Sequence, residues 1–153
     1  MNKYFAGIGS RTTPKEVLEF MERFARVLNN QGYILRSGGA DGADKAFERG
    51  AGNKKEIFRP HDATPEAMEI ASKVHPAWHN CKDYVRKLHG RNAQIIFGRA
   101  LDKPVEFVVA WTPGGKKVGG TAVGINLAEN HRIKVYNLFD NKTLLEIMER
   151  FFE

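Results

Sequence analysis

Three short glycine-centred segments carry the residue types that hold phosphate groups in proteins. They are residues 7–11 (GIGSR), 37–44 (SGGADGAD) and 119–121 (GGT), and each follows an apolar run or its loop. Glycine lets the backbone approach a ligand closely, and the free N–H groups at a helix N-terminus attract anions. We therefore predict that these segments bind a nucleotide or another ligand that carries phosphate.

The side chains in and near these segments suggest how such a ligand would be held. Hydroxyls and glycine N–H groups suit phosphate, whereas carboxylates suit ribose hydroxyls or a base amino group. An arginine adds charge and paired donors, and a tryptophan at the end of a strand can stack on a base. The candidate ligand-binding residues are Gly9, Ser10, Arg11, Ser37, Gly38, Gly39, Asp41, Asp44, Arg91, Asn92, Trp111, Gly119, Gly120 and Thr121.

Each of these features also has a simpler interpretation, which the sequence leaves open. The first segment would be an ordinary turn with a solvated Arg11, and Asp41 would cap the helix that follows it. The glycines of the third segment would let a helix pack tightly on a strand. Trp111 would belong to the core, and Arg91 with Asn92 would lie on a solvated helix face. A P-loop is excluded, because no Gly-Lys-Ser/Thr occurs.

Strands and helices alternate along the whole sequence. Short runs rich in β-branched and aromatic residues predict strands at residues 4–8, 33–36, 56–59, 105–111 and 134–138. Apolar residues at helical spacing predict helices at residues 14–30, 43–50, 64–75, 80–98 and 121–130, and a last helix from Asn141 or Thr143. Thr13 and Asn80 are the expected caps of the first and fourth helices. We predict an α/β fold, with a mainly parallel sheet covered by helices on both faces. The carboxyl ends of its strands would bring the three segments to one edge.

Composition and charge limit the class of protein. The 153 residues fit one domain spanning residues 1–153. The net charge of +6 favours anionic partners, although the basic residues stand in separate pairs and form no block. No apolar run could cross a bilayer and no secretion signal is visible, so we expect a cytoplasmic protein with no membrane partner. Cys81 is the only cysteine, which excludes an intramolecular disulfide.

Three histidines near this cysteine raise the question of a metal site. The spacing of His75, His79, Cys81 and His89 matches no common zinc motif. Pro76 would also break a helix shared by His75 and His79. We therefore predict no metal site and no cofactor, and the role of residues 75–89 stays open.

At these residues the chain resembles the SLOG superfamily, which joins the Smf/DprA DNA-processing proteins to the LOG cytokinin-activating phosphoribohydrolases. Residues 9–11 and 37–44 are similar to the DprA-type signature, and residues 91–92, 113–115 and 119–121 are similar to LOG elements. The resemblance is closest to the short stand-alone SLOG proteins of bacteriophage and prophage genomes. It implies a Rossmann-like three-layer sandwich that binds nucleotides or nucleotide-derived ligands, and a homo-oligomer that pairs through helices beside the ligand edge.

The chain departs from the LOG pattern where catalysis would occur. In LOG enzymes, glutamates close behind the Gly-Thr assist cleavage of the N-glycosidic bond. Here Ala122, Val123 and Gly124 follow Thr121, and Asn92 stands in place of the motif lysine. A hydrolase of this type would therefore lack its acid/base carboxylate. The residues that could substitute are Asp41, Asp44, Arg91 and Glu129.

Three functions follow from these observations and stay open at this point. The first is binding of a nucleotide-like small molecule at the converging segments, in order to sequester or sense it. The second is an N-glycosidase that acts on a nucleoside monophosphate. The third is DprA-like binding of single-stranded DNA, which rests mainly on net charge and which we rank below the small molecule as a partner.

Overall fold

The computed structural model describes residues 2–152 and is built on a five-stranded sheet. The strand order is β3-β2-β1-β4-β5, and all four strand pairings are parallel. The strands are β1 (Lys3–Gly9), β2 (Tyr33–Ser37), β3 (Lys55–Ile57), β4 (Phe107–Trp111) and β5 (Lys134–Asn137). The predicted α/β fold with a mainly parallel sheet is confirmed.

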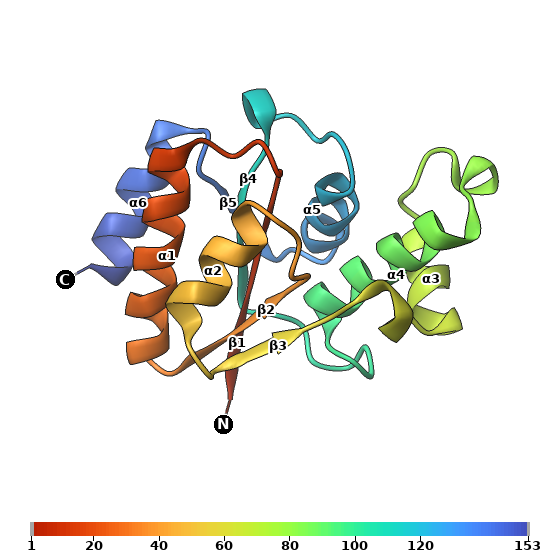
Figure 1. The fold of residues 1–153 in the computed structure, drawn as a ribbon, viewed down its shortest axis with the longest axis horizontal. Helices are drawn as coiled ribbons and strands as arrows, with labels where there is room; N and C mark the ends of the chain where they lie inside the picture. Colours follow the sequence, from red (N-terminus) through yellow and green to blue (C-terminus); the bar gives the residue numbers. More distant parts are fainter. Residues whose placement is uncertain (1, 153) are drawn as a thin grey trace.

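Helices cover both faces of this sheet and give three layers (Figure 1). One face carries α1 (Lys15–Asn30), α2 (Ala43–Ala51) and α6 (Asn141–Phe151). The other carries α3 (Pro65–Ser72), α4 (Asp83–Phe97) and α5 (Thr121–Asn130). Each face has its own cluster of buried apolar side chains. The interior strand β4 is therefore buried along its whole length, as a strand covered on both faces must be.

The order of the strands fixes where a ligand can bind. The chain builds outward from β1 through β2 to β3, then crosses back to place β4 on the other side of β1. Where the connections that follow two neighbouring parallel strands run to opposite sides of the sheet, a crevice forms at the carboxyl ends of these strands. α/β proteins bind ligands in such a crevice. Gly9 at the end of β1 is paired with Trp111 at the end of β4. The first segment (residues 7–11) therefore ends at this crevice, and the third segment (residues 119–121) follows β4 close to it.

The glycines of the first segment allow α2 to pack directly on β1. A Cβ atom on Gly7 would lie 2.5 Å from the ring of Phe47, and one on Gly9 would lie 2.7 Å from the Cβ of Ala43. Both separations are far below contact distance, so only glycine fits at these positions. The Gly-x-Gly pattern at the end of β1 is explained by helix packing.

The ends of several helices differ from the sequence-based prediction. Pro14, and not Thr13, occupies the N-cap position of α1, and the hydroxyl of Thr13 donates a 2.6 Å hydrogen bond to the Ser10 carbonyl. Asn80 closes a short 3-10 turn (Trp78–Asn80), and α4 begins only at Asp83. The predicted caps at Thr13 and Asn80 are therefore wrong, because the preceding turns use these residues.

Other predicted boundaries are confirmed. The hydroxyl of Thr64 accepts a 3.1 Å hydrogen bond from the Ala67 N–H at the start of α3. Helix α6 begins at Asn141, and Asp140 caps it by accepting from the Lys142 N–H at 3.0 Å. No helix among residues 2–152 is both long enough and apolar enough to cross a membrane.

A substitution at Gly9 tests whether packing holds α2 at the end of β1. In Gly9→Ala, the new methyl would meet the Ala43 Cβ at 2.7 Å and the Trp111 carbonyl oxygen at 3.1 Å. Because both neighbours are part of the packed interior, α2 must shift, and we expect the free energy of unfolding to fall by about 1–3 kcal/mol. Urea denaturation measures this change.

Gly120→Ala is the matched control, because Gly120 has helical φ and ψ angles and no heavy atom nearer than 3.9 Å to an added Cβ. We expect no loss of stability in this variant. Equal stability of Gly9→Ala and wild type would contradict the packing explanation.

Candidate functional site

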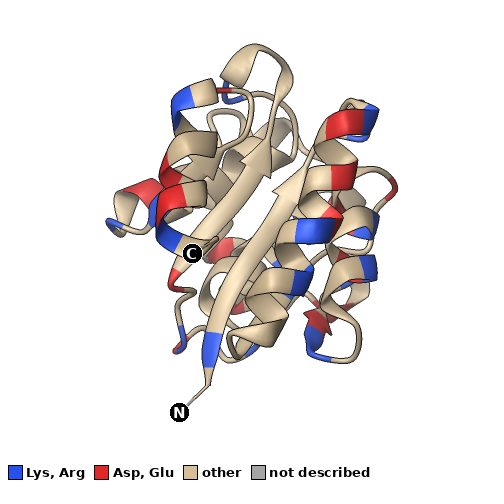
Figure 2. Ribbon diagram, turned by 90° about the vertical axis from the view of Figure 1, so that its left-hand side faces the viewer, with Lys and Arg blue, Asp and Glu red and all other residues tan. Residues whose placement is uncertain are grey.

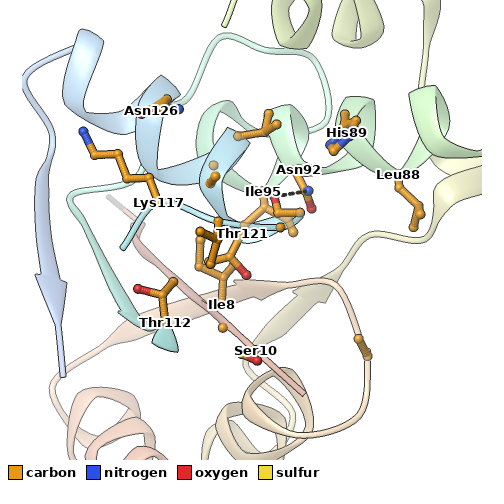
Figure 3. A pocket seen from close by; sticks show the side chains of 18 of the residues that line it. Ile8, Ser10, Leu88, His89, Asn92, Ile95, Thr112, Lys117, Thr121 and Asn126 are labelled. Atoms are coloured by element: carbon orange, nitrogen blue, oxygen red, sulfur yellow. Dashed lines mark hydrogen bonds between the residues drawn. The ribbon is translucent and has the colours of Figure 1, made fainter. Parts of the chain in front are cut away.

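A cavity of about 830 Å³ lies at the carboxyl ends of β1 and β4. Its wall is formed by the turn after β1, the loop and first turns of α5, the inner side of α4 and the segment after α3 (Figure 3). The volume is typical of a small-molecule site. The position is the crevice that the strand order creates.

The structure brings most of the predicted site residues to this cavity. Those that line it are Gly9, Ser10, Arg11, Asp44, Arg91, Asn92, Gly119, Gly120 and Thr121. The cavity wall does not include Ser37, Gly38, Gly39, Asp41, Trp111 or Glu129. The first and third segments thus contribute most of their residues, and the second contributes through Ala40 and Asp44.

The first segment offers a free positive charge. The Ser10 hydroxyl lies 2.7 Å from that of Thr12 and accepts the Thr12 N–H at 3.0 Å, so it is largely engaged within the turn. Arg11 is exposed. In the described part of the chain, its guanidinium takes part in no hydrogen bond or ion pair. Arg11 is therefore available to an anionic ligand.

The second segment is filled by the protein's own side chains. The Asp44 carboxylate accepts the Ala40 N–H at 3.2 Å. The Arg59 guanidinium donates to the Gly39 carbonyl at 3.3 Å. A Cβ atom on Gly38 would lie 2.7 Å from the Arg91 guanidinium and 2.9 Å from the Asp44 carboxylate. These glycines make room for internal contacts, so the segment acts as a structural junction.

The remaining predicted residues of this segment also lie away from the cavity. The Ser37 hydroxyl is buried and donates to the Gly7 carbonyl at 2.6 Å, which joins β2 to β1. Asp41 is exposed on the turn before α2. Neither side chain can reach a ligand in the cavity without leaving its present position.

Arg91 and Asn92 connect the second segment to the third. Arg91 Nη1 donates to the Gly38 carbonyl at 3.0 Å and to the Phe58 carbonyl at 3.1 Å. Arg91 Nε donates to the Asn92 side-chain oxygen at 2.8 Å, and Asn92 Nδ2 donates to the Gly120 carbonyl at 3.1 Å. Sequence reasoning missed this role, because the partners are backbone carbonyls of distant segments.

The third segment presents an uncapped helix N-terminus to the cavity. Gly120 is the N-cap of α5 and supplies no side chain to its first turn. Within residues 2–152, the amides of Gly120 and Thr121 donate no hydrogen bond to another protein group. A Cβ added at Gly119 would meet open space, although the φ of +69° favours glycine there, and one added at Gly120 would meet only Asn92 Nδ2 at 3.9 Å. Packing therefore does not explain Gly120. Free amides at the start of a helix are a favourable site for an anion.

Asp44 is the carboxylate that the cavity wall contains. Burial raises its pKa to about 6, and hydrogen bonds from the Ala40 and Gly38 amides and the charge of Arg91 oppose this rise. Asp44 can therefore hold or release a proton near neutral pH. Of the other catalytic candidates, Arg91 lines the cavity but is engaged as described above. Glu129 forms an ion pair with Lys117.

Trp111 lies on the opposite face of the sheet from the cavity. It is 8% exposed and belongs to the buried cluster under α1, α2 and α6. Its ring lies beside that of Phe139, with ring centres 6.3 Å apart. The core interpretation of Trp111 therefore describes its position, and the tryptophan provides no stacking surface in the cavity.

The far end of the cavity contains apolar and imidazole groups. Val74, Val85 and Leu88 line this end together with His75 and His89. Burial, with the nearby His75 and Arg91, lowers the pKa of His89. The cavity thus has an anion-attracting end at α5 and an apolar end between α3 and α4.

The pKa of Asp44 predicts an unusual dependence of stability on pH. Because the pKa rises from the ordinary value of 3.8 to about 6, the folded chain binds a proton in this interval that the unfolded chain has lost. The contribution of Asp44 to stability is greatest below pH 3.8 and falls as the pH rises toward 6. Asp44→Asn removes this dependence, and we expect it to be more stable than wild type at pH 7 by up to about 3 kcal/mol.

Urea denaturation of both proteins between pH 5 and pH 8 measures the difference, with pH chosen to bracket the pKa of about 6. If wild type instead gained stability relative to Asp44→Asn as the pH rose, attraction by Arg91 would outweigh burial and the sign would be wrong.

Comparisons with known proteins support the fold. No family model matches the chain, and no curated protein matches it either. The chain is similar to a solved structure of DNA processing protein A from Helicobacter pylori, with a TM-score of 0.59 and 18% identity. The similarity covers 97% of this chain and 72% of that one. That structure was described for its mode of binding single-stranded DNA. At this level of identity, what the two proteins share is the fold.

Proposed function

We propose that the chain binds a nucleotide through its phosphate at the N-terminus of α5. The observation that carries this proposal is the pair of unused amides of Gly120 and Thr121 at the cavity wall. Arg11 lines the same cavity, and its guanidinium pairs with no group of the described residues. A helix N-terminus and a guanidinium together favour a phosphate over a neutral ligand.

The other end of the cavity suits the base of a nucleotide. Val74, Val85 and Leu88 supply apolar surface, and the cavity volume of about 830 Å³ exceeds what a phosphate alone would need. A ligand with a charged end and a flat, largely apolar end matches this division. Sequestering or sensing such a nucleotide requires no further chemistry from the protein.

We also infer membership of the SLOG superfamily. The supporting observations are the two groups of motif residues, at 9–11 with 37–44 and at 91–92 with 113–121, and the shared fold with DNA processing protein A. The short phage-type SLOG proteins are the branch that the sequence resembles most. Pairing into a homo-oligomer belongs to the same proposal.

Single-stranded DNA is the second candidate ligand. The fold similarity to a DNA-binding protein favours it. Figure 2 shows acidic and basic residues interspersed on the side covered by α1 and α6, so this side offers no continuous basic surface. A strand would have to follow the carboxyl edge instead, where Arg11 and Lys116 are exposed. One of its nucleotides would then occupy the cavity.

Cleavage of the N-glycosidic bond of a bound nucleotide is the third candidate function, and incubation with adenosine monophosphate tests it. Asp44, with its pKa near 6, is the carboxylate of the cavity wall and would be the proton donor to the departing base. Release of free base from adenosine monophosphate, lost in Asp44→Asn, would identify an enzyme. Binding without release would leave the protein as a nucleotide binder.

Gly120→Ala tests the phosphate position directly. The added methyl would stand in the open space beside the unused amides, so it should displace the phosphate without disturbing the fold. We expect the affinity for adenosine monophosphate to fall by about tenfold or more, which corresponds to about 1.4 kcal/mol. Isothermal titration calorimetry with adenosine monophosphate and with pyrophosphate measures the change.

The thermal midpoint of the variant without ligand is the control, because Gly120 is unstrained. If Gly120→Ala bound adenosine monophosphate and pyrophosphate as tightly as wild type does, the phosphate would not lie at the N-terminus of α5. This conclusion would hold for any base.

Salt dependence separates single-stranded DNA from a free nucleotide. If a DNA strand follows the carboxyl edge, its affinity falls with salt, and Arg11→Ala should reduce the slope of log K against log salt by about 0.7. Arg26→Ala is the matched control, because it removes the same charge from α1 on the far side of the sheet. Fluorescence anisotropy of a labelled oligothymidylate at several salt concentrations measures the slope. Identical slopes for wild type and both variants would exclude this edge as the path of the strand.

A further inference from the structure

A compact group of metal-binding side chains lies at the apolar end of the cavity. His75, Cys81 and His89 each place a ligand atom within 4.8 Å of the other two. The Cys81 sulfur lies 3.7 Å from His75 Nε2, and the His75 and His89 rings are 4.6 Å apart. Two of these residues precede α4 and the third lies within it, so the fold, and not their spacing, brings them together.

One ring nitrogen of His89 is buried without a hydrogen-bond partner among residues 2–152, which supports a binding partner at this position that these residues do not supply. His89 is only 7% exposed, and its Nδ1 is buried without a hydrogen-bond partner in the part of the chain that the structure describes. Buried polar atoms in native proteins are nearly always paired. A cation held by the three side chains would supply the partner that the protein itself does not.

The donor set identifies the class of ion. Two imidazole nitrogens and one thiolate are ligands that Zn²⁺ prefers. Zinc–sulfur and zinc–nitrogen bonds at tetrahedral angles place sulfur and nitrogen about 3.5 Å apart. The 3.7 Å separation of the Cys81 sulfur and His75 Nε2 is already close to this value. The other pairs of ligand atoms lie within 4.8 Å of each other, so the side chains must move closer together to bind one ion.

We propose that His75, Cys81 and His89 bind one Zn²⁺ ion, with a fourth coordination position open to the cavity. No other His, Cys, Asp or Glu of residues 2–152 joins the group. His75 and His89 both line the cavity. Zinc sites with three protein ligands keep the fourth position for water or a ligand. This inference does not rest on the proposed nucleotide.

Binding has a defined proton balance. Cys81 loses its thiol proton to solvent and binds as the thiolate. His75 Nδ1 now accepts the Ala77 N–H at 3.0 Å. That bond is exchanged for the metal bond, since the ring must either bind through Nδ1 or carry its proton there in order to bind through Nε2. The affinity for zinc should therefore rise with pH.

Metal titration of the full chain tests the site. The reduced, chelator-treated protein is titrated with Zn²⁺ against a chromophoric competitor, and Co²⁺ is used as a spectroscopic substitute. We expect one equivalent bound, with a thiolate-to-cobalt charge-transfer band and the visible bands of tetrahedral Co²⁺. Cys81→Ala should abolish the charge-transfer band, and His89→Gln should weaken Zn²⁺ binding by more than about tenfold.

His79→Ala is the matched control, because His79 lies between the proposed ligands in sequence but is exposed and outside the group. It should bind like wild type. Circular dichroism of each variant without metal shows whether the fold is retained, and Cys81→Ala, at a half-buried position, provides the test if His89→Gln does not fold.

Two results would overturn the proposal. One is the absence of stoichiometric binding by wild type, and the other is a charge-transfer band that survives in Cys81→Ala. Added imidazole reports the open position, because it should change the visible Co²⁺ bands of wild type. Bands that do not respond to imidazole would mean that the fourth position is closed.

Discussion

One half-buried guanidinium holds the carboxyl edge of the sheet together. Arg91 donates to the Gly38 carbonyl after β2 and to the Phe58 carbonyl after β3, and through Asn92 it reaches the Gly120 carbonyl before α5. Hydrogen bonds from a charged donor are stronger than neutral ones and direct the groups that they join. The cavity depends on this chain of bonds, because it fixes α4, α5 and the turn after β2 relative to one another.

Similar glycine-rich sequences play different parts around this edge. Positions 7 and 9 require glycine because α2 lies against β1. Position 38 requires glycine because Arg91 and Asp44 occupy the space where a Cβ atom would stand. Gly120 alone among these faces open space. Whether a glycine allows close packing or leaves room for a ligand therefore depends on which segment of the fold lies beside it. Composition and local spacing can locate the turns, but they cannot separate packing from ligand approach.

The parts of the structure that depend on local pattern could be predicted from the sequence. Alternation of apolar runs predicts the α/β fold and the convergence of three turns, and Thr64 at the start of α3 is a local signal too. The bonds of Arg91 and the grouping of His75 with His89 could not be predicted, because they join residues that only the crossover between β3 and β4 brings together. Asn80 failed as a cap because the turn before α4 is longer than the sequence suggests.

Asp44 explains why an anionic ligand would favour α5 over the turn after β2. Both places offer backbone amides, but that of Ala40 already donates to the Asp44 carboxylate. Asp44 is in effect the protein's own anion at that turn, and a phosphate there would have to displace it and meet its charge above pH 6. The amides of Gly120 and Thr121 have no such acceptor among residues 2–152. The negative charge of Asp44 and the free amides of α5 therefore direct a phosphate toward α5. The rest of the ligand would then lie at the apolar end of the cavity, beside His75 and His89.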